Sequence, residues 1–264
     1  MIQVESLCKA YKNTIVLDDI SFRVNAGEVY GLLGVNGAGK TTTMKILTTL
    51  ARPDSGRVLI DGKDIVRHRS HIRSIIGLVP QERNLDRELS AWENLAIQGL
   101  LYRMPHLPAA IERQLKAVGL WNERHQPVVQ FSGGQQRRLL IARALLCEPQ
   151  VLFMDEPSIG LDPQVRHQLW QTVRDIAAQG ITVVLTTHYM EEAQSLCSRI
   201  GILHAGKLLA QGSLAQLQAS LEPSHSQEPH RPHPDHAPTR KPSLEDIFLH
   251  FTRQSHTKEP CYVP

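Results

Sequence analysis

The sequence predicts an α/β fold with an antiparallel β edge and an inserted α-helical subdomain. Three observations support this prediction. Short apolar runs alternate with segments of helical periodicity, several of these runs are apolar on both faces as in a parallel sheet, and the strand signal disappears between Pro80 and Pro149. The 264 residues, of which 41% are hydrophobic, are enough to bury one substantial core with a smaller lobe attached.

Two groups of strands are expected in this fold. Runs at 2–7, 21–24 and 57–60 are predicted to form the antiparallel edge, with turns at Asn25 and at Asp61. The carboxyl ends of parallel strands are where an open α/β sheet binds its ligands. Five runs of the fully buried type are predicted to form that parallel core, at 29–33, 75–79, 151–154, 182–186 and 200–204.

Residues from Glu82 to about Gln130 are predicted to form the helical subdomain. Ser90 begins the sequence SAWE, in which Ser90 and Glu93 have the spacing of a capping box at a helix start. Apolar residues recur at helical spacing at positions 89, 92 and 95, and again at 111, 115 and 118. The insertion is therefore expected to contain more than one amphipathic helix.

The C-terminal region changes in character at about residue 221. Segment 222–242 contains six prolines, four histidines and no large apolar residue, so it cannot offset the entropy that ordering would remove. We expect a folded domain at 1–220, a flexible Pro/His-rich linker at 221–243 and a tail at 244–264 with a short helix. Metal chelation is the alternative role for the histidines of the linker, His225, His230, His233 and His236.

Composition limits the class of protein. The formal net charge is +3, without a long run of Lys or Arg, which gives little support for nucleic acid as a partner. No leader peptide is apparent, and no apolar run reaches the roughly 18 residues of a membrane helix, so any role at a membrane is expected to be played from outside the bilayer. Free thiols in a reducing compartment are expected for the widely spaced cysteines Cys8, Cys147, Cys197 and Cys261.

A phosphate-binding loop is predicted at GVNGAGKTT, residues 34–42. The sequence matches G-x-x-x-x-G-K-[ST] between an apolar run and a helical stretch, the context that this pattern requires. The glycines let backbone amides turn inward around an anion, with a helix N-terminus behind them. Lys40 is expected to reach the terminal phosphates, and the Thr41 hydroxyl to bind Mg²⁺. The predicted nucleotide-binding residues are Gly34, Val35, Asn36, Gly37, Ala38, Gly39, Lys40, Thr41 and Thr42.

Two carboxylates follow the buried run in VLFMDEP, residues 151–157. Asp155 is the expected Mg²⁺ partner, either directly or through water. Glu156 is expected to be the general base that accepts a proton from the water attacking the γ-phosphate. The alternative for the pair taken alone is a solvated loop start before Pro157. Their place in the same chain as a phosphate loop favours the catalytic interpretation.

Three single residues stand at matching breaks in the pattern. Gln81 follows the run at 75–79, so that its amide is expected to meet the metal or the attacking water. His188 follows the run at 182–186 and is expected to hydrogen-bond the γ-phosphate. Tyr11 precedes the core and is expected to stack on adenine. Each of the three, taken alone, is as well explained by an ordinary surface or core position.

A second anion-binding turn is predicted at FSGGQQRR, residues 131–138. Ser132 is a good N-cap, and Gly133 and Gly134 leave backbone amides bare at the positive end of the helix that follows. A capped helix start without a ligand is the alternative. The question is why one chain carries two such turns.

The ordered set Tyr11, GVNGAGKTT, Gln81, FSGGQQRR, VLFMDEP, SIGLD and His188 resembles the ATP-binding subunit of ABC transporters over about residues 2 to 215. The resemblance implies a RecA-like P-loop NTPase core in the 1–220 domain. It also implies ATP and Mg²⁺ as cofactors and ATP hydrolysis as the activity, with Gln81 and Asp155 joining Thr41 at the metal.

The resemblance also implies a use for the second turn. In this family two ATPase domains pack head to tail, and the Ser-Gly-Gly turn of one closes over the nucleotide held by the other. A second ATPase subunit is therefore required, most simply in a homodimer. Asp162 in SIGLD is expected at the dimer seam, with helix capping as its alternative role. The residues expected to contact the partner's ATP are Ser132, Gly133, Gly134 and Gln135.

The motifs TTHYMEEAQSLCSRIGILHAGKLLAQG and SLEDIFL resemble the ATPases of exporters for drugs, polysaccharides and Nod-factor-type oligosaccharides. This implies an integral membrane permease as a separate partner, a peripheral location on the cytoplasmic face of the inner membrane, and no nucleic acid partner. A groove for a permease helix is expected on the helical subdomain. Candidates for that groove, with core packing as the alternative, are Leu85, Leu89, Trp92 and Tyr102.

A soluble ATPase of the same fold that acts on ribosomes or nucleic acid is the alternative function. Ribosome-associated members of the family usually carry two ATPase domains in one chain, whereas this chain has one phosphate loop. DNA-repair members separate the two halves of the domain by a long coiled coil, whereas Lys40 and Ser132 are close in this sequence. Both observations favour transport.

Overall fold

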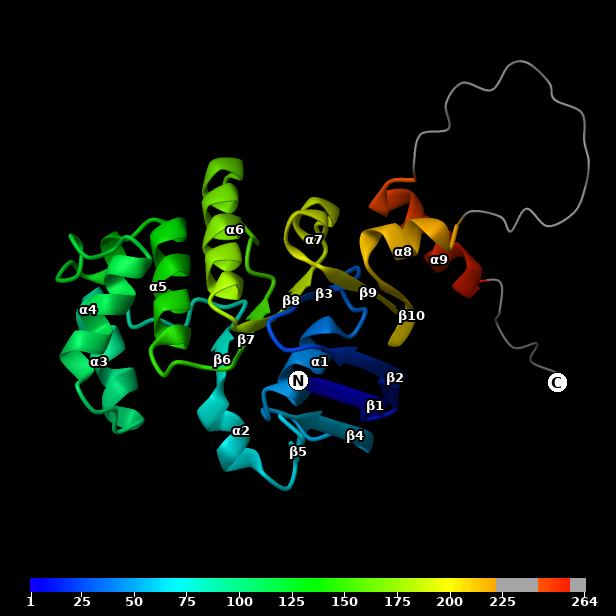
Figure 1. Cartoon of the computed structure of the whole chain (residues 1–264), viewed down its shortest axis with the longest axis horizontal. Helices are drawn as coiled ribbons and strands as arrows, with labels where there is room; N and C mark the ends of the chain where they lie inside the picture. The colour runs from blue at the N-terminus through cyan, green and yellow to red at the C-terminus, as the bar shows by residue number, and fades with distance from the viewer. Residues whose placement is uncertain (222–241, 257–264) are drawn as a thin grey trace, which may run out of the picture.

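Two β-sheets, the helices that cover them and a lobe of helices at one end make up the fold (Figure 1). The computed structural model describes residues 1–221 and 242–256. Residues 222–241 of the predicted linker, with its four histidines, and the end of the predicted tail lie outside the described residues, and the domain boundaries remain predictions. The predicted α/β class, with its antiparallel edge and helical insertion, is confirmed.

The antiparallel sheet has the strand order β2-β1-β4-β5. The predicted turn after β4 places Asp61 at φ 52° and Gly62 at φ 70°, the left-handed pair that a two-residue hairpin requires. The first two strands are longer than predicted, because β1 continues to Tyr11 and β2 begins at Thr14, and the added residues are mostly exposed or half-buried. The strands are β1 (Ile2–Tyr11), β2 (Thr14–Val24), β4 (Ser55–Ile60) and β5 (Lys63–Asp64).

The second sheet has the order β10-β9-β3-β8-β7-β6 and is parallel except for the pair formed by β9 and β10. The five predicted core strands are all present, and every residue of β3, β7 and β8 is buried. β10 was not predicted because it is an edge strand without a continuous apolar run. The strands are β3 (Val29–Leu33), β6 (Ile76–Val79), β7 (Val151–Asp155), β8 (Thr182–Thr187), β9 (Arg199–His204) and β10 (Lys207–Gly212).

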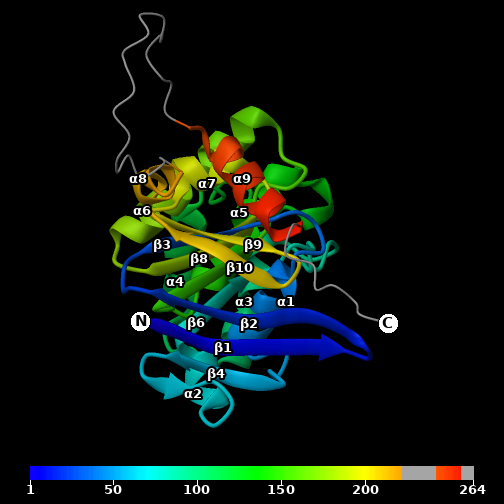
Figure 2. The same ribbon diagram turned by 90° about the vertical axis from the view of Figure 1, so that its right-hand side faces the viewer.

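Helices cover both faces of the parallel sheet (Figure 2). α1 (Lys40–Leu47) lies between the two sheets and contacts β2, β7 and β8. α6 (Pro163–Ala178) and α7 (Met190–Leu196) pack on the opposite face. α2 (Arg69–Ile75) leads directly into β6. The central strands are therefore shielded from water except at their ends, where the site must lie.

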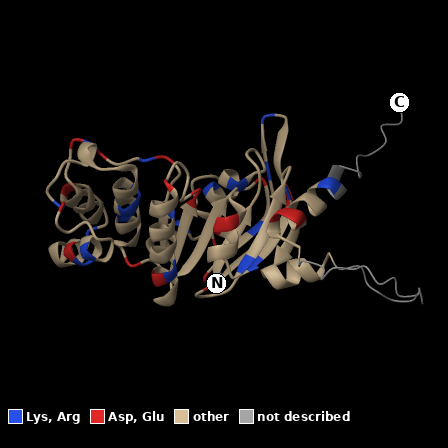
Figure 3. Ribbon diagram, turned by 90° about the horizontal axis from the view of Figure 1, so that it is seen from above, with Lys and Arg blue, Asp and Glu red and all other residues tan. Residues whose placement is uncertain are grey.

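The helical lobe lies beyond the β6 edge of the sheet and contains α3 (Ala91–Leu101) and α4 (Leu107–Ala117). The predicted capping box is present at α3, where the Ser90 hydroxyl accepts from the Glu93 amide at 3.2 Å. α5 (Gly133–Leu145) also packs against α3 and α4, so the lobe extends beyond the predicted limit of residue 130. Acidic and basic positions are mixed over lobe and core alike (Figure 3).

The C-terminal helix α9 (Leu244–His256) packs against α7, β10 and α8 (Leu214–Ala219). It begins at a reciprocal cap in which the Ser243 hydroxyl accepts from the Asp246 amide at 3.2 Å and the Asp246 carboxylate accepts from the Ser243 amide at 2.8 Å. Leu244 and Ile247 are fully buried in this contact. The helix therefore shares an apolar cluster with β9.

The packing of α9 makes a stability prediction. Ile247→Ala should lower the free energy of unfolding by about 2 to 4 kcal/mol, because the substitution removes apolar volume from a closed cluster. Leu249→Ala is the matched control, since Leu249 lies on the same helix and is 43% exposed, and it should change stability by less than about 1 kcal/mol. Urea denaturation of the full chain measures both values. Equal losses would contradict the packing of α9 through its Ile247 face.

Candidate functional site

The predicted phosphate loop lies between the end of β3 and the start of α1. Gly37 has φ 82° and Gly39 has φ 107°, both in the left-handed region that favours glycine. A Cβ at Gly39 would approach the Val16 carbonyl oxygen within 2.8 Å and the Leu17 side chain within 2.6 Å. A side chain at this position would therefore distort the loop, whose amides lie at the N-terminal end of α1.

A cavity of about 340 Å³ opens beside this loop. It brings together Gln81 from the end of β6 and Glu156 from the end of β7, which are far apart in the sequence. Val16 and Ile159 also line it and were not predicted, since nothing in their local sequence marks a ligand contact. The predicted phosphate-loop residues that line it are Asn36, Gly37, Gly39, Lys40, Thr41 and Thr42.

The other predicted phosphate-loop residues support the loop from behind or beside it. Ala38 is buried, and a Cβ at Gly34 would lie 2.4 Å from the Leu203 carbonyl oxygen, so this turn packs directly on β9. Val35 is 46% exposed, and its carbonyl oxygen accepts from Lys40. These three residues shape the loop, whereas the cavity itself is lined by their neighbours.

Lys40, Glu156 and His188 are in direct contact. The Lys40 Nζ lies 3.0 Å from Glu156 Oε1 and also donates to the Gly34 carbonyl oxygen at 2.7 Å. The His188 Nδ1 lies 2.7 Å from Glu156 Oε2. Lys40 and Glu156 are only 5% and 4% exposed, so their opposite charges interact with little screening by solvent. Three residues predicted separately from the sequence thus form one cluster.

A hydroxyl and a carboxylate suited to Mg²⁺ lie beside this cluster. The Thr41 Oγ1 is 3.5 Å from Asp155 Oδ1, and the Thr186 hydroxyl donates to the same carboxylate oxygen at 2.5 Å. Mg²⁺ prefers oxygen ligands. Proteins usually supply only one or two of them, and phosphate and water complete the coordination of the ion. The donor set therefore fits the predicted metal. Thr186 was not predicted as a site residue, because a threonine inside a buried strand carries no distinctive pattern.

Glu156 occupies an unusual backbone conformation, with φ 47°. For a residue with a side chain this region is disfavoured and is found where the surroundings determine the geometry. The Glu156 amide donates both to the Thr186 hydroxyl at 3.0 Å and to the Thr186 carbonyl oxygen at 3.2 Å. β8 therefore secures the residue predicted to be the general base.

A second buried carboxyl group, on Glu192, supports the loop after Glu156. It accepts hydrogen bonds from the Ser158 hydroxyl and from the Trp170 Nε1, the latter at 3.2 Å. Burial raises the pKa of Glu192 above its usual range, against these hydrogen bonds, which lower it. Glu192 was not predicted as a site residue, because its partners come from distant segments.

The remaining predicted site residues lie elsewhere on the described chain. Tyr11 ends β1, is 46% exposed and does not line the cavity. Ser132 caps α5, where its hydroxyl accepts from the Gln135 amide at 3.2 Å. Asp162 occupies the N-cap position of α6, but its side chain makes no capping hydrogen bond there. The expected side-chain cap at Asp162 is therefore wrong, although the helix does begin at Pro163.

A sequence profile described as ABC transporter matches residues 17–159 of this chain, the part that contains the phosphate loop, Asp155 and Glu156. The chain belongs to the ABC transporter family. It is 42% identical over 221 residues to the Nod factor export ATP-binding protein I of Paraburkholderia xenovorans, which covers 83% of this chain and 73% of that protein. It is also 42% identical over 220 residues to the daunorubicin resistance ATP-binding protein DrrA3 of Streptomyces coeruleorubidus. This match covers 83% of this chain and 70% of that protein.

Solved ABC transporter structures share the fold. The structure of an ATP-binding subunit of an ABC transporter has a TM-score of 0.80 at 28% identity and covers 96% of this chain and 99% of its own. The dimeric post-hydrolysis structure of the ATP-binding cassette MJ0796, bound to ADP and Pi, has a TM-score of 0.73 at 29% identity. It covers 81% of this chain and 99% of its own. These relatives confirm the predicted P-loop core and the prediction of an ATP-hydrolysing subunit of an ABC-type exporter.

The site of this ABC subunit is suited to phosphate chemistry. The amides of the phosphate loop and the Lys40 ammonium are donors suited to phosphate oxygens, and the Glu156 carboxylate is an acceptor suited to a water proton. The His188 imidazole holds the Glu156 carboxylate from the side opposite Lys40. The alternative of a ribosome- or nucleic-acid-associated ATPase is not favoured by any of these relatives.

Lys40→Ala should weaken ATP binding by about 10- to 100-fold, because a hydrogen bond between charged groups contributes about 1.5 to 3 kcal/mol. Lys45→Ala is the control, since Lys45 lies on the same helix but is exposed and does not line the cavity. Titration of the purified chain with a fluorescent ATP analogue measures both affinities. Unchanged affinity in Lys40→Ala would refute the role assigned to this residue.

Proposed function

We propose that this chain closes head to tail on a second ATPase subunit, most simply a copy of itself, with ATP shared between the two. The observation that carries this proposal is the composition of the cavity. Its lining residues come from the phosphate loop, Gln81, Glu156 and their neighbours, and none comes from the Ser132–Gly134 turn within the described chain. The turn is thus available to a nucleotide held by another subunit.

The geometry of that turn supports the proposal. Ser132 is exposed, and its amide donates to Gln135 Oε1 at 2.9 Å, which completes the capping box. The first amides of a helix have no partner within the helix, and the box satisfies only those of Ser132 and Gln135. The amides of Gly133 and Gly134 therefore stand at the positive end of α5, as an anion site requires.

In the closed pair each residue has a separate task. Lys40 and the phosphate loop hold the β- and γ-phosphates. Thr41, Asp155 and Gln81 would hold Mg²⁺, which would neutralise charge on the phosphates when bound. Glu156 accepts the proton of the attacking water. The turn of the partner subunit grips the same γ-phosphate, so hydrolysis and phosphate release remove the group that joins the two subunits. Asp162 then lies at the seam, and Tyr11 contacts the adenine.

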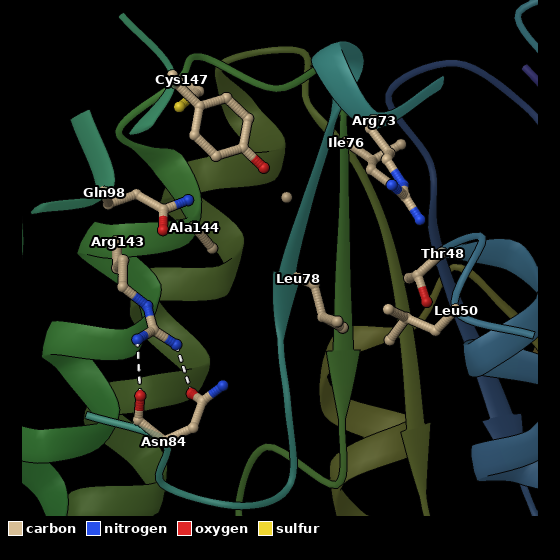
Figure 4. A pocket seen from close by; sticks show the side chains of 12 residues that line it. Thr48, Leu50, Arg73, Ile76, Leu78, Asn84, Gln98, Arg143, Ala144 and Cys147 are labelled. Carbon is tan, nitrogen blue, oxygen red and sulfur yellow. Dashed lines mark hydrogen bonds between the residues drawn. The ribbon is translucent and has the colours of Figure 1, made fainter. Parts of the chain in front are cut away.

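A groove between the core and the helical lobe supports the proposal of a permease partner. It has a volume of about 470 Å³ and runs along the exposed edge strand β6 (Figure 4). Leu78 of β6 and Leu50 after α1 line one side, and Gln98 of α3 faces them from the lobe. A mixed apolar and polar groove at a strand edge is suited to a short helix from another protein.

The predicted groove residues divide between groove and core. Tyr102 lines the groove and is 50% exposed. Leu85 is buried in the core of the lobe, and Trp92 packs against the same core. Leu89 is half-buried and does not line the groove. Core packing, the alternative interpretation, therefore describes Leu85 and Trp92, and Tyr102 is the predicted residue that we assign to permease contact.

We propose that this chain lies at the cytoplasmic face of the inner membrane, held there by the permease. Among the described residues no helix has the length and apolarity needed to span a bilayer, so contact with the membrane is assigned to the separate subunit. The relatives are named for export of Nod factor and for daunorubicin resistance. We propose a comparable exported compound as the cargo, recognised by the permease.

Glu156→Gln should bind ATP but hydrolyse it at least about 100-fold more slowly, because the general base is lost. Since the γ-phosphate then persists, the variant should form a stable dimer in ATP. Multi-angle light scattering with ATP and with ADP measures the mass, and a Glu156→Gln, Ser132→Arg double variant is the control, because it blocks the turn. A monomer in ATP for Glu156→Gln would contradict the shared site.

Tyr102→Asp should abolish copurification of a polytopic permease with the Glu156→Gln chain from membranes solubilised in ATP, because it puts a charge in the groove. Ile15→Asp is the control, since Ile15 is an exposed apolar residue, 68% exposed, on the distant strand β2. Mass spectrometry of the captured proteins compares the two. Retention of the permease by Tyr102→Asp, or capture of ribosomal proteins instead, would refute the assigned docking groove.

A further inference from the structure

Arg137 is a buried cation that does not line the nucleotide cavity. Its side chain lies on α5 and is 4% exposed. Burial lowers the pKa of Arg137 to about 10, so the guanidinium still carries its charge at neutral pH. A buried cation is tolerated only when several acceptors surround it, and the identity of those acceptors shows what the residue supports.

The guanidinium of Arg137 donates to four backbone carbonyl oxygens. Nε donates to Pro157 at 2.6 Å, and Nη2 donates to Glu156 at 2.6 Å and to Asp155 at 3.2 Å. Nη1 donates to Pro80 at 2.6 Å. Three successive carbonyls of the loop that carries the catalytic carboxylates, and one at the end of β6, are thus bound to one planar group.

We infer that Arg137 is a positioning residue that holds the catalytic loop, residues 155–157, at a fixed place against α5 and β6. This inference rests on the proposed role of Glu156 as general base. The loop needs such support because Glu156 is held at φ 47°, from which the chain would relax if its carbonyls were free. With three consecutive carbonyls fixed, the Cα–Cβ direction of Glu156 is fixed as well.

The contact to Pro80 extends the same support to the second polar residue of the cavity. Pro80 directly precedes Gln81, which lines the cavity opposite Glu156. One guanidinium therefore holds the segments that carry both residues. Because α5 begins at the Ser132 turn, the placement of the catalytic loop is also tied to the helix that we assign to the partner's nucleotide.

The shape of the guanidinium, rather than its charge alone, is what this geometry uses. Arginine presents five donors in a rigid plane, whereas lysine presents one compact ammonium group. Arg137→Lys keeps the positive charge but cannot reach Pro80, Glu156 and Pro157 together. This substitution therefore separates support of the loop from electrostatic attraction of ATP.

Arg137→Lys should lower kcat for ATP hydrolysis by about 10- to 100-fold and change KM for ATP by less than about threefold, since the phosphate loop is untouched. The matched control is Arg124→Lys. Arg124 is half-buried, donates to the Trp121 carbonyl oxygen at 2.9 Å within the lobe and does not line the cavity, so both constants should stay within about twofold. Melting temperatures of both variants are measured alongside. A kcat within twofold of the wild type in Arg137→Lys would overturn the inference.

A double-mutant cycle tests whether Arg137 acts through Glu156. In the Glu156→Gln background, Arg137→Lys should lower the remaining rate by less than about threefold. The carboxylate that Arg137 positions is already absent in this background, so its displacement can cost no further activity. A structural defect unrelated to Glu156 would give the same loss in both backgrounds, and that additive result would overturn the inference. A Glu156→Gln chain that hydrolyses ATP at the wild-type rate would instead refute the general-base assignment of the proposed function.

Discussion

The register of three parallel strands brings together the phosphate loop, the two carboxylates and His188. β8 lies between β3 and β7 and pairs Thr187 with Leu33 on one side and Thr186 with Asp155 on the other. The phosphate loop after β3, the carboxylates at the end of β7 and His188 after β8 are therefore brought to one edge. Thr186 secures two of them through its hydroxyl, which donates to the Asp155 carboxylate and accepts from the Glu156 amide. Loss of this pairing would separate the groups even with every motif intact.

The motifs could be predicted because their chemistry is encoded locally, whereas their supports could not. The phosphate loop needs glycines at fixed spacing, and Glu156 follows Asp155 at the end of an apolar run. Arg137, by contrast, bonds to carbonyls of residues 80 and 155–157, and no sequence pattern marks an acceptor that every residue possesses. Tyr11 is a single-residue prediction of another kind, since it does not line the cavity in the described chain, and its contact with adenine stays a prediction.

The same distinction explains the fold. Buried strands of the parallel sheet carry a continuous apolar run, so their existence and approximate limits followed from the sequence. β10 (Lys207–Gly212) and the outer half of β2 each carry only a three-residue apolar run whose residues are mostly exposed or half-buried, so neither shows the long buried run of a core strand. Ser90 and Ser132 both begin helices as expected, because a capping box is a local structure whose partners are three residues apart.

A short segment after β6 joins the groove to the nucleotide cavity. The Pro80 carbonyl oxygen accepts from Arg137, Gln81 lines the cavity, and the Asn84 carbonyl oxygen accepts from Arg143 at 2.8 Å in the groove (Figure 4). Both arginines belong to α5, so one helix holds this segment at two points, one on each side of Gln81. A displacement of α5 relative to the sheet must therefore strain or move the whole segment. The lobe is therefore connected through direct contacts to Gln81, which lines the nucleotide cavity.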